Sequence, residues 1–158
     1  VWFLKGHYLG QVGLADGGAK EALFLGCADS LVESIACSGF GQIFDSMKGE
    51  FGKGVHLSPQ SCRAYKSSEN FMFICEAALG REEERLTLTA PWPELDRKEV
   101  HEVQGKLSAR VRAGERFEHE ERIVFHPGQC KPVYLIQLES PGLHTWYNTD
   151  SPYKDLLK

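Results

Sequence analysis

At residues 51–58 the chain reads Phe51-Gly52-Lys53-Gly54-Val55-His56-Leu57-Ser58. Two glycines flank a lysine, and a short apolar run that is typical of a strand follows them. Glycine permits a positive φ angle or a close approach of the backbone to a ligand. A glycine turn that leads directly into a short strand can therefore form the wall of a site for a flat molecule. This stretch becomes informative together with other segments, far away in the sequence, that complete a pattern around it.

The composition of the chain is that of an ordinary globular protein. It has 158 residues, of which 42% are hydrophobic and 25% are charged, and this length is enough for one domain with its own core. The net charge of -4 argues against a broad nucleic-acid-binding face. The apolar runs are too short to cross a membrane. Because the chain begins with Val1 rather than Met, we expect it to be part of a longer protein.

The five cysteines show neither a metal-binding nor a disulfide pattern. Their number is odd, their spacing is irregular and no C-x-x-C motif occurs; they are Cys27, Cys37, Cys62, Cys75 and Cys130. We expect buried or partly buried free thiols and an intracellular location, nuclear or cytoplasmic. The six histidines lack the spacing of a zinc site, so we expect no metal.

Short apolar runs predict an α+β domain of two packed, mostly antiparallel small sheets with helices at their edges. The expected strands lie at 22–25, 55–57, 71–78, 86–89, 123–125 and 133–138, with another strand-like run at 1–4. Asp29 or Ser30 is expected to cap one helix, which ends at Gly39, and a second helix is expected to run from Pro59 to Tyr65.

Polar segments separate these runs. The pattern predicts a loop at 41–53, a solvated turn at the acidic run Glu82-Glu83-Glu84 and a long irregular segment at 98–118. Glu121 stands just before an apolar strand, and His56 lies between two apolar residues. Taken alone, each is more typical of an ordinary solvated carboxylate or a half-buried histidine than of a catalytic group.

Four segments between about residues 20 and 139 match, in order and in spacing, the conserved segments of one known protein family. They are Leu23-Phe24-Leu25-Gly26-Cys27-Ala28-Asp29 with the later Gly39-Phe40; the 51–58 stretch; Ala77-Ala78-Leu79-Gly80; and Glu121-Arg122-Ile123-Val124-Phe125 with Gln129 and the strand at 133–136. Together they resemble the catalytic domain of the poly(ADP-ribose) polymerase family, the diphtheria-toxin-like ADP-ribosyltransferases. Its segments read "L-F-H-G-T", "F-G-K-G-I-Y-F-A", "A-L-G" and "E-Y-I-V-Y".

The resemblance implies a cleft for NAD, as substrate, between two small sheets. In the family a His holds the nicotinamide ribose, a Tyr stacks on the nicotinamide ring and a Glu hydrogen-bonds the ribose. Here Leu25 stands at the His position, His56 at the Tyr position and Glu121 at the Glu position. Gly26 matches the glycine whose backbone holds the nicotinamide amide. Leu25 deprives a ribose hydroxyl of its partner, at about 1–3 kcal/mol if that hydroxyl stays buried.

Two further positions concern the nicotinamide pocket. The family serine that contacts the amide falls at Ala64, although a shift in register brings Ser67 or Ser68 there instead. Tyr65 is then the candidate for the second stacking ring. The Leu–His combination is most similar to the plant radical-induced-cell-death-type members, whose domain of this fold is described as inactive. Those members often lack the glutamate that this chain keeps as Glu121.

The resemblance leaves two functions open for a domain at 1–139, followed by an extension at 140–158 that is packed on it or flexible. The first is a catalytically weak or inactive binding or scaffolding module, with a protein partner and a possible NAD or nicotinamide-like ligand. The second is an NAD-dependent mono-ADP-ribosyltransferase that uses Glu121, with His56 stacked on the nicotinamide. An unrelated α+β binding unit is the third reading.

Overall fold

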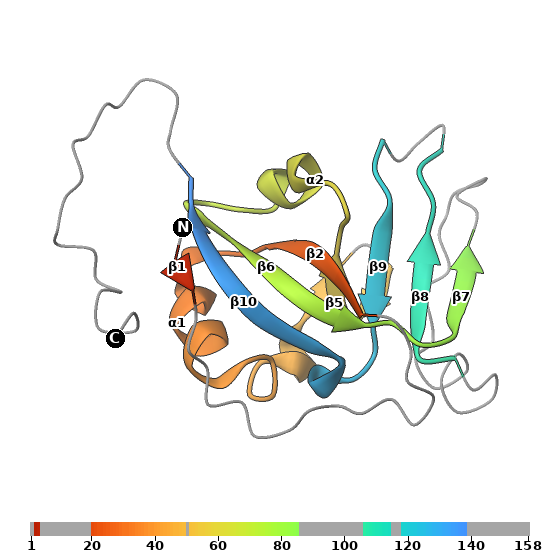
Figure 1. Ribbon diagram of the computed structural model, residues 1–158, viewed down its shortest axis with the longest axis horizontal. Coiled ribbons are helices and arrows are strands. Elements are labelled where there is room, and N and C mark those ends of the chain that lie inside the picture. The colour runs from red at the N-terminus through yellow and green to blue at the C-terminus, as the bar shows by residue number, and fades with distance from the viewer. Residues whose placement is uncertain (1, 4–19, 50, 86–105, 115–117, 139–158) are drawn as a thin grey trace, which may run out of the picture.

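The apolar run Phe71–Ala78 forms β6, an inner strand of a four-stranded antiparallel sheet. The computed structural model describes residues 2–3, 20–49, 51–85, 106–114 and 118–138 (Figure 1). The strand order in this first sheet is β1-β10-β6-β2. The other three strands are β1 (Trp2–Phe3), β2 (Lys20–Gly26) and β10 (Cys130–Gln137).

A second four-stranded sheet stands beside the first and contains residues 55–57 of the 51–58 stretch. Its order is β5-β9-β8-β7, and β7 runs parallel to β8 while the other pairs are antiparallel. Its strands are β5 (Val55–Leu57), β7 (Glu82–Arg85), β8 (Ser108–Val111) and β9 (Glu121–Val124). A two-stranded sheet, β3 (Lys48–Gly49) with β4 (Gly52–Lys53), precedes β5. In Gly54 the φ angle is 149°, a conformation that favours glycine.

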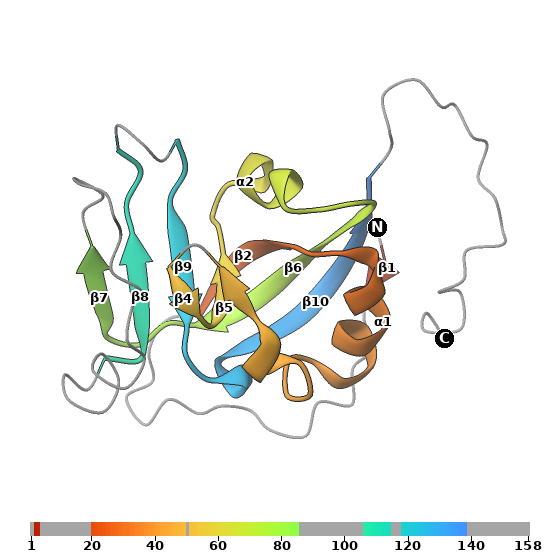
Figure 2. The ribbon, with the colours of Figure 1, turned by 180° about the vertical axis from the view of Figure 1, so that it is seen from behind.

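Two helices complete the described part of the chain. Helix α1 (Asp29–Ser38) lies on one face of the first sheet, as the two opposite views show (Figures 1 and 2). Its apolar residues Val32, Ile35 and Ala36 join the main core with side chains from β2, β6 and β10. Helix α2 (Ser61–Lys66) follows β5 and lies against the end of β2. The 3-10 turns are η1 (Phe44–Ser46) and η3 (Pro127–Gln129).

The two larger sheets are joined at the ends of β2 and β5. Phe24 and Ser58 exchange two backbone hydrogen bonds, of 2.8 and 2.9 Å, in an isolated antiparallel bridge. This bridge places the carboxyl end of β2, where Gly26 lies, beside the carboxyl end of β5. The residues that the sequence singled out on β2 and β5 are therefore neighbours in space.

The α+β class and the mostly antiparallel sheets are confirmed, and several local predictions are corrected. Glu82–Glu84 is part of strand β7 rather than a turn, and the predicted irregular segment at 98–118 contains strand β8. The expected loop at 41–53 contains η1 and the β3–β4 pair, so a third small sheet joins the two expected ones. The strand-like run at 1–4 contains β1 (Trp2–Phe3), and its residues 1 and 4 lie outside the described residues. The strand expected at 86–89 and the 140–158 extension lie outside them too.

The start of α1 also differs in its capping. Neither Asp29 nor Ser30 caps the helix, because the N-cap residue is Ala28 and it makes no side-chain cap. Instead, the Glu69 carboxylate accepts a hydrogen bond of 2.9 Å from the Asp29 backbone N–H. Asp29 accepts hydrogen bonds from the backbone and side-chain amides of Asn70. A distant loop thus replaces the local cap. The predicted end at Gly39 is confirmed.

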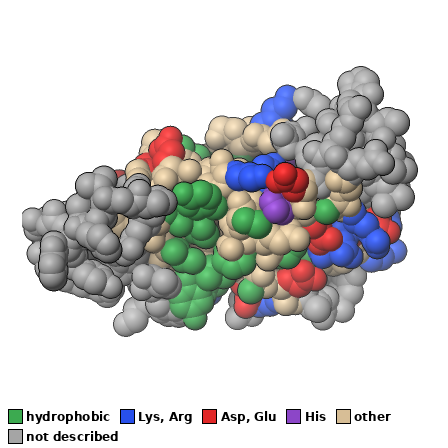
Figure 3. Space-filling model, turned by 90° about the horizontal axis from the view of Figure 1, so that it is seen from above, with side chains coloured by type: hydrophobic (Ala, Val, Ile, Leu, Met, Phe, Trp, Pro, Cys, Tyr) green, Lys and Arg blue, Asp and Glu red, His purple; other side chains and the backbone are tan. Residues whose placement is uncertain are grey.

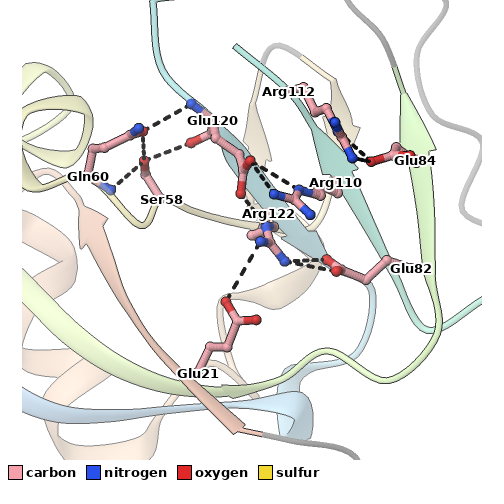
Figure 4. A network of polar contacts seen from close by, with 9 residues as sticks. All are labelled: Glu21, Ser58, Gln60, Glu82, Glu84, Arg110, Arg112, Glu120 and Arg122. Atoms are coloured by element: carbon pink, nitrogen blue, oxygen red, sulfur yellow. Dashed lines mark hydrogen bonds and ion pairs between the residues drawn. The ribbon is translucent and has the colours of Figure 1, made fainter.

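Charged side chains hold the second sheet together on its outer part and tie it to the first (Figure 4). Arg122 of β9, with 7% of its side chain exposed, donates to Glu120 at 2.8 Å and to both oxygens of Glu82 at 2.8 Å. It also lies 3.8 Å from Glu21 of β2. Burial raises the pKa of Glu120, but hydrogen bonds from Arg110 and Arg122 outweigh it and hold that pKa below its usual value. The ion pairs explain why an acidic run forms an edge strand.

Replacement of Arg122 should reveal how much this network contributes to stability. We expect Arg122→Met to lower the free energy of unfolding by about 2–3 kcal/mol, because carboxylates that are mostly removed from water lose their partner. Arg112→Met is the matched control. Its ion pair with Glu84 is 49% exposed on both sides, so we expect a loss below about 1 kcal/mol. Urea unfolding of both variants measures the difference, and equal losses would contradict a special role for Arg122.

Candidate functional site

A pocket of about 430 Å³ opens where β2, β5 and α2 meet. This volume lies within the range of about 300–1,000 Å³ that is common for small-molecule sites. Its charged and titratable lining side chains are Lys48, His56, Arg63 and Glu121, with the buried thiol of Cys27. The rest of the lining is Phe24, Leu25, Gly26, Leu31, Ser46, Met47, Gly49, Gly54, Leu57, Ser58, Ala64 and Ser67.

The strand register brings His56 and Glu121 together. His56 of β5 is opposite Ile123 of β9, and Glu121 stands two residues earlier on the same face of β9. The His56 Nδ1 atom lies 3.1 Å from Glu121 Oε2, and His56 Nε2 lies 3.0 Å from the Gly52 carbonyl oxygen. The Phe51 ring is nearly parallel to the imidazole, at 11° with centroids 6.3 Å apart. The imidazole is thus fixed on several sides.

Helix α2 supplies a second partner for the same carboxylate. Arg63 donates from Nε to Glu121 Oε1 at 2.5 Å, and its Nη2 atom contacts the same oxygen. Only 5% of the Glu121 side chain is exposed. Both carboxylate oxygens therefore have a protein partner, Arg63 at Oε1 and His56 at Oε2.

The partners of Glu121 determine the pKa of its carboxyl group. Burial raises the pKa of the Glu121 carboxyl, but the hydrogen bond and charge of His56 and the charge of Arg63 outweigh burial and hold that pKa below its usual value. Both nitrogens of His56 face oxygen atoms. A neutral imidazole has one N–H, so only the doubly protonated ring can donate to Gly52 and Glu121 at once.

Gly26 permits the close contact between β2 and α2 that forms one side of the pocket. A Cβ atom at this position would lie 2.0 Å from the Ala64 carbonyl oxygen, far inside van der Waals contact. The Ala64 oxygen also accepts a hydrogen bond of 2.8 Å from the Ser68 hydroxyl. Glycine is thus required here because the backbone of α2 packs directly on the end of β2.

The structure brings most of the predicted site residues to one place. Leu25, Gly26, His56 and Glu121 all line the pocket, although Leu25 is only 3% exposed. Of the alternatives near α2, Ala64 and Ser67 line the pocket and Ser68 does not. Tyr65, predicted as a stacking ring, is not among the lining residues. It is 50% exposed, because α2 directs it away from the pocket side on which Arg63 and Ala64 lie.

Arg63 is the important residue that the sequence did not single out. It lies within a short helix, and its partner Glu121 is 58 residues away. No local spacing indicates such a pair. An arginine one turn into the helix that follows β5 could have been considered as a partner for Glu121 only after the strand pairing was known.

No model of a known protein family matches the chain, and no curated protein is significantly similar to it. None of the described helices is both long and apolar enough to cross a membrane. Within the described ranges, no group of three or more His, Cys, Asp and Glu side chains is arranged to hold a metal ion.

The lowered pKa of Glu121 predicts a pH-dependent contribution to stability. Since an unfolded glutamate has a pKa of about 4.3, the stabilisation by the ionised carboxylate is fully present above about pH 5. It is lost as the pH falls through the lower pKa of the native state. We expect Glu121→Gln to reduce the free energy of unfolding by about 1–3 kcal/mol at pH 7.

Urea unfolding from pH 7 to pH 3 measures this contribution. The difference between the original chain and Glu121→Gln should shrink below pH 5. A constant difference across this range would contradict the assignment of an ionised, paired Glu121.

Proposed function

We propose that this chain is a divergent poly(ADP-ribose) polymerase-like domain that binds rather than catalyses. Its pocket takes a small planar ligand that carries an amide, of which nicotinamide is the simplest example. The domain then acts as a binding or scaffolding module for another protein. The proposal is supported by the resemblance of four ordered segments and by the common pocket that Gly26, His56 and Glu121 line.

The observation that supports an inactive domain most strongly is that both oxygens of the Glu121 carboxylate already have protein partners. Catalysis of transfer from NAD would require this carboxylate to hydrogen-bond a ribose and to stabilise positive charge that develops on it. Here Arg63 and His56 already occupy its two oxygens, and the side chain is almost fully buried. Arg63 also neutralises the negative charge that the transition state needs. A ribose would have to displace an ion pair to reach Glu121.

Leu25 supports the same conclusion from the other side of the pocket. An imidazole that could hold ribose hydroxyls is replaced by a buried aliphatic group. A hydroxyl buried against Leu25 without another partner costs about 1–3 kcal/mol. The geometry therefore favours a ligand that fills only the part of the pocket near Gly26 and His56.

A mono-ADP-ribosyltransferase is the alternative, and one observation favours it. His56 and Glu121 are within hydrogen-bonding distance at a pocket wall, as a ring partner and a catalytic carboxylate would need to be. Ligand binding that moved Arg63 away from Glu121 would free the carboxylate. Transfer of a single ADP-ribose unit is then favoured over growth of a polymer, because Leu25 binds the ribose less well than a histidine would.

Calorimetry with nicotinamide and with NAD, combined with a labelled-NAD transfer assay, distinguishes these functions. We expect nicotinamide to bind with a saturable heat and no label to be transferred to the chain or to added protein. Transfer that vanishes in Glu121→Ala would make the enzyme reading correct. The absence of heat from both ligands at millimolar concentration would contradict the pocket proposal itself.

Two glycine variants test whether binding uses this pocket. A Cβ atom at Gly49 would lie 2.5 Å from the His56 ring, so Gly49→Ala forces the imidazole to shift. We expect it to weaken nicotinamide binding by about tenfold, or about 1.4 kcal/mol. Gly41→Ala is the matched control, because nothing lies within 4 Å of its added Cβ. Equal affinities for the two variants would place the ligand elsewhere.

A further inference from the structure

A cysteine and a histidine that play no part in the pocket meet on the outer side of α2. Cys62 is exposed, and its Sγ atom lies 3.7 Å from His119 Nδ1 and 3.6 Å from His119 Nε2. His119 stands two residues before β9. The view from above shows acidic and basic side chains close together on this surface of the protein (Figure 3).

A carboxylate also lies near the His119 imidazole. Glu118 Oε2 lies 3.7 Å from His119 Nε2 and accepts a hydrogen bond of 2.5 Å from the Lys66 ammonium. Lys66 belongs to α2, as Cys62 does, so the ion pair ties the segment before β9 to the helix. Both nitrogens of the His119 imidazole lie at nearly the same distance from the Cys62 sulfur, so whichever nitrogen lacks a proton can accept the thiol proton. A thiol beside an imidazole that can take its proton is the arrangement of an activated nucleophile.

We propose that Cys62 is a reactive thiol that forms a mixed disulfide with a low-molecular-weight disulfide such as glutathione disulfide. The His119 imidazole accepts the proton of the Cys62 thiol as the sulfur attacks one sulfur of the glutathione disulfide. A new S–S bond forms, the S–S bond of the reagent breaks, and its electron pair leaves on the second sulfur. That thiolate takes the proton back from His119, so the products are the mixed disulfide and one reduced glutathione.

The other four cysteines lack this combination of exposure and imidazole. Cys27, Cys75 and Cys130 are buried, and burial raises the pKa of the Cys27 thiol to about 12. Cys37 on α1 is exposed like Cys62. Among the described residues, however, no imidazole lies within hydrogen-bonding distance of its sulfur. Cys37 is therefore an internal reference, in the same molecule, for an exposed thiol without a base.

The first test compares Cys62 with Cys37 in the folded chain. Brief treatment with limiting iodoacetamide at pH 7, followed by peptide mass spectrometry, gives the two alkylation rates. We expect Cys62 to react about tenfold faster than Cys37, and His119→Gln to bring Cys62 to the rate of Cys37. Equal rates in the original chain, or a ratio that His119→Gln leaves unchanged, would overturn the assignment of His119 as the base.

The second test uses glutathione disulfide itself. Intact-mass measurement should show one glutathione adduct, which peptide mapping places on Cys62. The adduct should persist in Cys37→Ser and disappear in Cys62→Ser, and it should form more slowly in His119→Gln. An adduct that maps to Cys37, or no adduct on Cys62, would overturn the proposal. Neither test depends on the nicotinamide-like ligand, so this proposal can fail while the proposed function stands.

Discussion

The Glu121 carboxylate is almost completely removed from water, and a charge in that position needs partners within the protein. The partners come from two different elements, since His56 belongs to β5 and Arg63 to α2. The interaction thus fixes the second sheet, the helix that follows β5 and, through Gly26 and Ala64, the end of β2. Removal of one partner would leave a buried carboxylate with only part of its compensation, which destabilises the fold.

The same interaction links stability to the proposed function. The hydrogen bonds that satisfy Glu121 in the folded chain are the ones that a ribose would have to replace in an NAD-cleaving enzyme. A domain that keeps Arg63 on this carboxylate gains stability and gives up an available acceptor. The pocket itself remains, because Gly49 leaves room beside the His56 ring and Gly26 lets α2 pack on the end of β2. These two facts together support the proposal of ligand binding without transfer.

Much of the architecture could be predicted from the sequence because the apolar runs are short and well bounded. The runs at 71–78 and 55–57 are strands, and Gly39 ends the first helix. Strand β7 could not be predicted, because long-range ion pairs such as that of Arg122 with Glu82 stabilise it rather than an apolar pattern. Strand β8 could not be predicted either, because it contributes only Ala109 and Val111 to an apolar core, within a charged segment. The candidate site was found in part: Leu25, Gly26, His56 and Glu121 share a pocket, whereas Tyr65 is outside it. Arg63 could not be identified as a site residue because its partner Glu121 is distant in the sequence.

The most direct test of the account is a carbon-13 NMR titration of the Glu121 carboxyl in the original chain and in Arg63→Gln. The account predicts a midpoint in the original chain below the ordinary glutamate value of about 4.3, and a higher midpoint once Arg63 is replaced. A midpoint at or above the ordinary value in the original chain, unchanged in Arg63→Gln, would contradict it. The Glu121 carboxylate would then be free of Arg63 in solution, and the physical basis for a binding module rather than an enzyme would be lost.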